Sequence, residues 1–269
     1  MIENGGFSYK PILDDEDKLK VFPLCIDNFF DEPDTIREWA NSLPKERSPE
    51  GSWPGYRTLP LHEIDNEFHI TLMLKVLSAY YDLKYANVSW SSCRAYFQVI
   101  PKYDDENDDV KNVGWIHQDD GDELAGIIYL TPNADVNSGT SLFSLKKEHE
   151  NSHLRFSNNP HKHAMYNGMR IDKEEYENAL HKHNDKFLET LKFGNVYNRL
   201  IVYGSQEYHR ANSFVTNSED RMTLVFFMRG IKSGTDERTS RYPLSRVKDN
   251  KNFDNNLRAR IKYLNSKPL

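Results

Sequence analysis

The stretch GWIHQDDG at 114–121 decides how this sequence is interpreted. Its His117 and Asp119 are two positions apart, and residues i and i+2 point to the same face of a β-strand. The two side chains can therefore converge on one metal ion. A His-x-Asp pair is common by chance, so its weight depends on whether further ligands occur later in the chain.

A second histidine occurs much later, in NRLIVYGSQEYHRANSF at 198–214. This segment predicts an apolar strand, then a turn, then His209. Two histidines and one carboxylate on one face of a metal ion leave its other positions open for further ligands. His117, Asp119 and His209 are therefore the candidate metal ligands. Buried without a metal or another partner, these polar side chains would be costly.

Arg221 opens the next predicted strand, RMTLVFFM at 221–228. An arginine that projects from a strand can hold a carboxylate with two parallel charge-assisted hydrogen bonds. Thr223 falls on the same predicted face and is placed to add a hydroxyl donor. Arg210 and Arg229 remain alternative anchors.

Short β-rich runs dominate the chain from residue 88 onward. They include VSWSSCRAYFQVI (88–100), LAGIIYL (124–130) and GTSLFSL (139–145), and several are apolar on both faces, so they must be covered on both sides. Two helices predicted upstream, at 33–43 and at 66–81 after the cap Asp65, supply one cover. We expect a mainly β fold with flanking helices, a double-stranded β-helix (jelly roll) core covered on one face by N-terminal helices.

The predicted domain organisation is one domain over 1–229, with helical support at 1–87 and the jelly-roll core at 88–229. One helix interrupts the strands at about 173–191, with Asp172 and Glu175 as a capping box and Gly194 at its end. Its buried face is expected to hold Tyr176, Leu180, Phe187 and Leu191, with His183 as a packed histidine. The segments 101–116 and 144–197 are predicted to form lids or substrate walls.

Beyond this domain, residues 230–269 form a basic tail with ten Lys or Arg against four Asp or Glu, and we expect a solvated helix there. The acidic run DDENDD at 104–109 lacks the turn glycine and the distal glutamate of a calcium loop, so it is interpreted as a solvated loop.

Taken in order, these parts resemble the 2-oxoglutarate/iron(II) dioxygenase superfamily, nearest to its prolyl-4-hydroxylase-like branch. GIIYLTPNADVNSGTSLF (126–143) is similar to the branch's strand, loop and Gly-Thr turn, and RLIVYGSQEYHRANSF (199–214) is similar to its segment around the second histidine. DNFFDEPDTIREWA (27–40) and WPGYRT (53–58) also look like small uncharacterised oxygenases of marine bacteria and their phages.

The resemblance implies a jelly-roll enzyme that uses Fe(II), 2-oxoglutarate as cosubstrate, and dioxygen to hydroxylate an unactivated C–H bond. It makes His117, Asp119 and His209 the iron ligands and catalytic residues, and Arg221 the cosubstrate anchor. Residues that match cosubstrate or pocket positions of this family are Tyr129, Tyr96 and Gln98. A peptidyl or small amino-acid-like substrate is expected. The DNA-repair branch is not favoured, because position 227 is Phe227 and not a second arginine.

Two alternatives stay open. HENSH at 149–153 matches the His-Glu-x-x-His motif of zinc hydrolases, although its surroundings are polar and lack an apolar helical stripe. The chain is also compatible with a catalytically inactive jelly roll that only binds a ligand.

Composition excludes several other classes. A net charge of −6 argues against a general nucleic-acid binder, and two cysteines, Cys25 and Cys93, cannot organise a disulfide framework or a cysteine zinc site. The first residues carry no signal pattern, and no apolar run reaches the length of a membrane span. The sequence therefore predicts a cytoplasmic protein with a small-molecule or peptide substrate and no membrane partner.

Overall fold

The computed structural model describes residues 21–81, 83, 88–103, 110–119, 121–149, 159–217 and 219–233. The acidic run at 104–109, most of the HENSH motif and nearly all of the basic tail lie outside the described residues, as do the predictions made for them.

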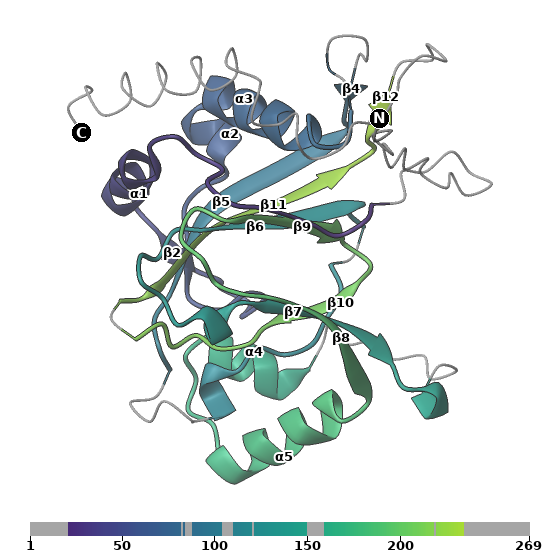
Figure 1. Ribbon diagram of the computed structural model, residues 1–269. Coiled ribbons are helices and arrows are strands. Elements are labelled where there is room, and N and C mark those ends of the chain that lie inside the picture. Colours follow the sequence, from purple (N-terminus) through teal and green to yellow (C-terminus); the bar gives the residue numbers. More distant parts are fainter. Residues whose placement is uncertain are drawn as a thin grey trace, which may run out of the picture.

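Two antiparallel sheets face each other (Figure 1). The large sheet contains, in spatial order, β1 (Leu24–Ile26), β9 (Leu200–Gly204), β6 (Leu124–Tyr129), β11 (Arg221–Arg229), β5 (Ser92–Ile100), β3 (Tyr56–Arg57) and β2 (Glu46–Arg47). The small sheet contains β10 (Tyr208–Ala211), β7 (Thr140–Leu145) and β8 (Phe187–Phe193). A separate pair is formed by β4 (Val88–Ser89) and β12 (Lys232–Ser233). The predicted jelly-roll fold is confirmed.

Strand β11 shows how the large sheet separates its two faces. Its even-numbered residues Met222, Leu224, Phe226 and Met228 belong to the main hydrophobic core. Its odd-numbered residues therefore point to the other face, toward the small sheet. This alternation turns Arg221 into the space between the sheets.

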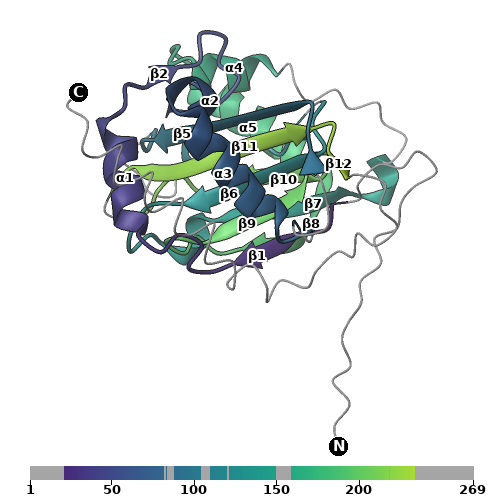
Figure 2. The same cartoon turned by 90° about the horizontal axis from the view of Figure 1, so that it is seen from above.

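Three N-terminal helices cover the outer face of the large sheet (Figures 1 and 2). They are α1 (Pro33–Ser42), α2 (Leu61–Ile64) and α3 (Asn66–Leu77). Trp39 of α1 joins them to the sheet, because its ring lies 4.7 Å from the ring of Phe68 on α3 and 5.3 Å from that of Phe97 on β5. Asp65 accepts a hydrogen bond of 2.9 Å from the backbone N–H of Phe68, so the predicted helix cap is confirmed.

The helix predicted at 173–191 is wrong in its second half. Helix α5 spans Lys173–Asn184, and residues 187–193 form β8, which pairs with β7. The spacing of Phe187 and Leu191 fits a helix as well as a strand. The segment forms a strand because it pairs with the backbone of β7. Leu191 is 40% exposed, and Gly194 follows a strand and not a helix.

The first half of that prediction is confirmed. Asp172 accepts a hydrogen bond of 3.0 Å from the N–H of Glu175, while Tyr176 and Leu180 are buried. His183 is a packed histidine whose Nε2 lies 2.6 Å from the carbonyl of Ile116.

Helix α4 (Pro160–Tyr166) is an element that the sequence did not lead us to expect. Asn159 caps it by accepting hydrogen bonds from two backbone N–H groups, and Pro160 starts it, which is a recognisable start signal. Helices α4 and α5 lie at the opposite end of the molecule from α1, α2 and α3 (Figure 1). Three short 3-10 helices span Val110–Asn112, Val136–Ser138 and Lys147–His149.

None of the helices in the described part of the chain is long and apolar enough to cross a membrane.

Candidate metal centre

The backbone brings His117 and His209 together by a single antiparallel bridge. The N–H of His117 donates to the carbonyl of His209 at 3.0 Å, and the N–H of His209 donates back at 2.8 Å. Residues directly opposite each other in such a pair share a face of the sheet. The strand geometry assumed for His117 and Asp119 is therefore reduced to one bridge, but that bridge places both imidazoles on the same side.

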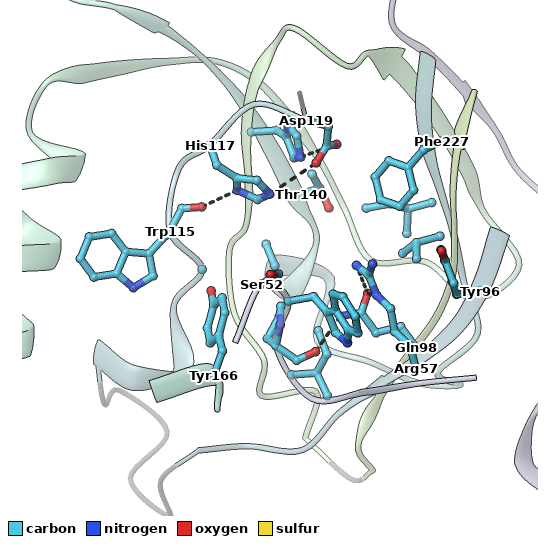
Figure 3. A pocket seen from close by; sticks show the side chains of 18 of the residues that line it. Ser52, Arg57, Tyr96, Gln98, Trp115, His117, Asp119, Thr140, Tyr166 and Phe227 are labelled. Carbon is cyan, nitrogen blue, oxygen red and sulfur yellow. Dashed lines mark hydrogen bonds and ion pairs between the residues drawn. The ribbon is translucent and has the colours of Figure 1, made fainter. Parts of the chain in front are cut away.

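Asp119 completes the group from two residues further along. Its N–H donates to the carbonyl of Ser205 at 3.0 Å, which holds the 117–119 segment against the turn after β9. Asp119 Oδ2 lies 3.3 Å from Nε2 of His209, and Oδ1 lies 3.9 Å from Nε2 of His117. One possible ligand atom from each residue lies within 4.8 Å of the others (Figure 3).

Both imidazole rings are oriented by backbone carbonyls. Nδ1 of His117 lies 2.8 Å from the carbonyl of Trp115, and Nδ1 of His209 lies 2.8 Å from that of Glu207. A carbonyl only accepts, so each Nδ1 carries the hydrogen and each Nε2 of a neutral ring presents a lone pair. Two lone pairs and a carboxylate can then face one another, an arrangement that favours a cation between them.

The electrostatics of the three groups support this preference. Burial, helped by neighbouring His209, lowers the pKa of His117 to about 3. Burial alone would raise the pKa of Asp119, but the two histidines and Arg57 outweigh it and lower that pKa to about 2. Burial disfavours the charged form of His209, yet the carboxylate of Asp119 raises its pKa. Oδ2 of Asp119 is buried without a well-formed hydrogen bond, so a divalent cation fits this group.

A cavity of about 560 Å³ opens next to the three residues, between the two sheets (Figure 3). Among the residues that line it are Tyr96, Gln98, His117, Asp119, Thr140, His209 and Arg221. The cavity thus reaches both the histidine group and the start of β11.

Arg221 is a buried cation with no counter-ion among the residues that the structure describes. It is 2% exposed, its Nε donates to the carbonyl of Ser138 at 3.3 Å, and its Nη2 is buried with no hydrogen-bond partner. Its guanidinium lies 5.5 Å from the centre of the Tyr129 ring, and no ion pair joins it to a carboxylate in the described residues. Burial lowers the pKa of Arg221. An unpaired buried charge is costly, so this position fits an anionic ligand.

The remaining predicted pocket residues lie in register across three strands. Thr223 on β11 is opposite Gln98 on β5 and Tyr129 on β6. Tyr96 and Gln98 line the cavity, whereas Tyr129 and Thr223 are fully buried beside it. The hydroxyl of Tyr129 donates to Oγ1 of Thr140 at 2.9 Å, and Oγ1 of Thr223 has no partner.

The two alternative anchors do not line the cavity. Arg210 points from the outer face of β10, with its guanidinium 5.2 Å from the centre of the Phe143 ring. Arg229 is exposed at the far end of β11. Of the three arginines, only Arg221 reaches the cavity.

Several cavity residues were not predicted from the sequence, including Arg57, Thr140 and Lys162. Arg57 belongs to the WPGYRT motif and Thr140 to the Gly-Thr turn. Both motifs were recognised in the sequence, but no role in the site was predicted for either side chain. Lys162 had no local signal, because it reaches the cavity only through the unexpected helix α4.

The described residues do not support a metal site at the competing HENSH motif. His149 ends the 3-10 helix Lys147–His149, and the rest of the motif lies outside the described residues. In the part of the chain that the structure describes, His117, Asp119 and His209 are the group able to hold a metal ion.

Fold and cavity together define a class: a jelly-roll protein whose two sheets enclose two histidines and an aspartate beside a buried arginine. The sequence matches the model of the Family of unknown function (DUF6445) over residues 15–220. The chain belongs to this family.

None of the curated proteins matches this sequence. Among solved structures, the chain is similar to EvdO2 from Micromonospora carbonacea var. aurantiaca, with 15% identity, a TM-score of 0.47 and coverage of 80% of this chain and 89% of that chain. It is similar to a prolyl hydroxylase from Trichoplax adhaerens in complex with a hypoxia inducible factor peptide, with 11% identity, a TM-score of 0.44 and coverage of 77% and 83%. HygX from Streptomyces hygroscopicus, with nickel, 2-oxoglutarate and hygromycin B bound, gives 11% identity, a TM-score of 0.44 and coverage of 77% and 82%.

Proposed function

We propose that this chain is an Fe(II)- and 2-oxoglutarate-dependent oxygenase that hydroxylates an unactivated C–H bond of a small amino-acid-like or peptidyl substrate. The proposal rests on one observation: the same cavity is lined by a group that needs a cation and by a buried residue that needs an anion. His117, Asp119 and His209 require a cation, and buried Arg221 requires an anion.

The donor set supports iron(II) as the cation. Two neutral imidazoles and one carboxylate form the facial arrangement typical of non-haem iron oxygenases, and they leave positions open for a bidentate 2-oxo acid and dioxygen. When bound, iron with 2-oxoglutarate supplies the oxidising chemistry, in which decarboxylation to succinate and carbon dioxide is coupled to hydroxylation of the substrate.

The residues of this chain then bind and orient the metal and the cosubstrate. The backbone carbonyls of Trp115 and Glu207 hold the two histidine rings with Nε2 toward the metal. Arg221 holds the distal carboxylate of 2-oxoglutarate, with Thr223 and Tyr129 in its buried surroundings. Tyr96 and Gln98 form the facing wall from β5.

The test is turnover of 2-oxoglutarate by the purified chain. With added iron(II) and dioxygen, we expect slow formation of succinate even without a substrate, and no succinate when iron is omitted. His117→Ala should abolish this activity. If 2-oxoglutarate binds but no succinate forms with any peptide, amino acid or small acid, the chain is a ligand-binding jelly roll and the proposed activity is wrong.

A further inference from the structure

Two further cations, Arg57 and Lys162, line the cavity and are used neither for the metal nor for the cosubstrate. They come from distant parts of the chain, β3 and α4. The loaded site needs neither of them, because the charges of the metal, its aspartate, the cosubstrate and Arg221 balance one another. Their charge is therefore left for something else in the cavity.

Arg57 is held in place by a neutral partner. Its Nε and Nη2 donate to Oε1 of Gln98 at 3.3 and 3.1 Å, and Nε2 of Gln98 in turn donates to the carbonyl of Pro54 at 2.7 Å. The guanidinium lies 4.8 Å from the centre of the Trp53 ring (Figure 3 shows Arg57 beside Gln98). Burial lowers the pKa of Arg57 to about 10, as expected for a cation that lacks a close counter-ion.

Aromatic rings surround this guanidinium. Tyr96 and Phe227 lie 5.4 and 5.7 Å from it, measured to the ring centres, and both also line the cavity. The indole Nε1–H of Trp53 is buried with no hydrogen-bond partner. The part of the cavity around Arg57 therefore offers a cation, a hydrogen-bond donor without a partner, and an apolar wall.

Lys162 is also buried, at 6% exposure, and its ammonium lies 5.9 Å from the centre of the Tyr166 ring. No ion pair joins it to a carboxylate within the described ranges. Burial lowers the pKa of Lys162 to about 8; the carboxylate of Asp119 acts in the opposite direction, and the charge of Arg57 adds to the lowering. Two like charges in one cavity are unfavourable until an anion joins them.

The carboxylates of the cavity wall are already committed. Asp119 belongs to the metal group, and Asp122 accepts from Arg94 at 2.6 Å. Glu50 is exposed to solvent, so its charge is screened. Arg57 and Lys162 are attracted by the charge of Asp119, but neither forms an ion pair with a carboxylate of the described wall.

The loop at 48–55 packs closely against the elements around these two residues. Gly51 and Gly55 have φ of +67° and +69°, which favours glycine. A Cβ at Gly51 would lie 2.2 Å from the carbonyl oxygen of His163 on α4, and a Cβ at Gly55 would lie 2.2 Å from that of Val99 on β5. The loop is therefore packed between the helix that carries Lys162 and the strand next to Arg57.

We infer that the substrate carries a carboxylate, which Arg57 and Lys162 bind, and an apolar part that packs on Trp53, Tyr96 and Phe227. This inference rests on the proposed function for the position of the cosubstrate. Two donor nitrogens of Arg57 are already bonded to Gln98, so the remaining donors match one carboxylate better than a phosphate. A cavity of about 560 Å³ that also holds 2-oxoglutarate leaves room for a small acid or a single side chain.

The test uses chain loaded with nickel(II) and 2-oxoglutarate, which fills the site without turnover. Phenylacetate and its neutral analogue phenylacetamide are titrated by calorimetry up to about 10 mM, a range in which even millimolar affinity is measurable. We expect phenylacetate to bind and phenylacetamide to bind at least tenfold more weakly. Arg57→Gln and Lys162→Met should each weaken phenylacetate at least tenfold and leave phenylacetamide unchanged.

Arg210→Gln and Lys182→Met are the matched controls, since Arg210 lies on the outer face of β10 and Lys182 is exposed on α5. Both should bind phenylacetate like the unmodified chain. The melting temperature without probe gives a second measurement: Lys162→Met should not lower it, because the substitution removes a buried charge that forms no ion pair within the described residues.

Three results overturn the inference: equal binding of both probes, no binding of phenylacetate at all, or tighter binding of phenyl phosphate than of phenylacetate. Binding of 2-oxoglutarate to the nickel-loaded chain is measured first. If that step fails, the proposed function is wrong; if it succeeds and the probes fail, only the substrate class is wrong.

Discussion

Replacing Arg221 by alanine tests the proposed cosubstrate site most directly. Arg221 is 2% exposed, its Nη2 has no partner, and its one hydrogen bond, to the carbonyl of Ser138, is 3.3 Å long. Most of its hydrogen-bonding capacity is therefore free for a ligand. A charge-assisted pair of this kind in a dry site is worth about 2–4 kcal/mol. The dissociation constant of 2-oxoglutarate should then rise by about 30- to 1000-fold in Arg221→Ala.

The assay is a calorimetric titration of 2-oxoglutarate into nickel-loaded chain, in which no turnover consumes the ligand. Arg221→Lys should recover only part of the affinity, because one ammonium cannot make the two parallel contacts of a guanidinium. Metal affinity should hardly change, since the side chain is not among the three candidate ligands. Arg210→Ala and Arg229→Ala serve as controls and should bind 2-oxoglutarate like the unmodified chain.

A second readout separates an anchor from a structural arginine. Removing a buried cation that has no counter-ion in the described part of the chain should not lower the free energy of unfolding of the ligand-free chain. The gain in melting temperature on adding 2-oxoglutarate should disappear. An Arg221→Ala titration that overlays the unmodified one would refute the assignment. So would a large loss of stability without ligand, because the guanidinium would then be paired within the fold.

Three further predictions concern the metal, the pH response and a helix cap. Alanine at His117, Asp119 or His209 should remove most bound iron(II), measured as metal content, while His149→Ala should retain it; the reverse pattern would favour the HENSH motif. Burial, with a contribution from His62, lowers the pKa of His69 from 6.5 to about 4, so the folded state resists protonation and loses stability as the pH falls from 6.5 toward 4. His69→Leu should flatten this fall in chemical unfolding experiments, and an unchanged slope would contradict the reasoning. Asp65→Ala should cost about 1 kcal/mol of unfolding free energy by removing the cap of α3, as measured by urea denaturation.

Local signals in the sequence were enough for the elements that have strong caps and regular periods. Asp65 before α3 and Asp172 before α5 mark helix starts correctly, and the start predicted at residue 33 for α1 is confirmed. The end of α5 was not predictable in this way, because Phe187 and Leu191 satisfy a helical spacing as well as a strand. Only the pairing partner β7, which lies far away in the sequence, decides between them.

The same limit applies to the cavity. His117, Asp119, His209 and Arg221 were predicted from their order and spacing, and the structure brings them to one cavity. Lys162 could not be predicted, because it reaches the cavity through a short helix whose only sequence signal is Asn159–Pro160. Tertiary contacts between distant segments carry no signature in a single sequence.

The alternation along β11 has a consequence for how this gene can change. Met222, Leu224, Phe226 and Met228 are locked against the helices, while Arg221 faces the cavity one residue away. Deletion of Arg221 would move Met222 into its place and present a thioether where the guanidinium now lies. In a deep mutational scan, insertions and deletions in this strand should therefore be far more harmful than substitutions.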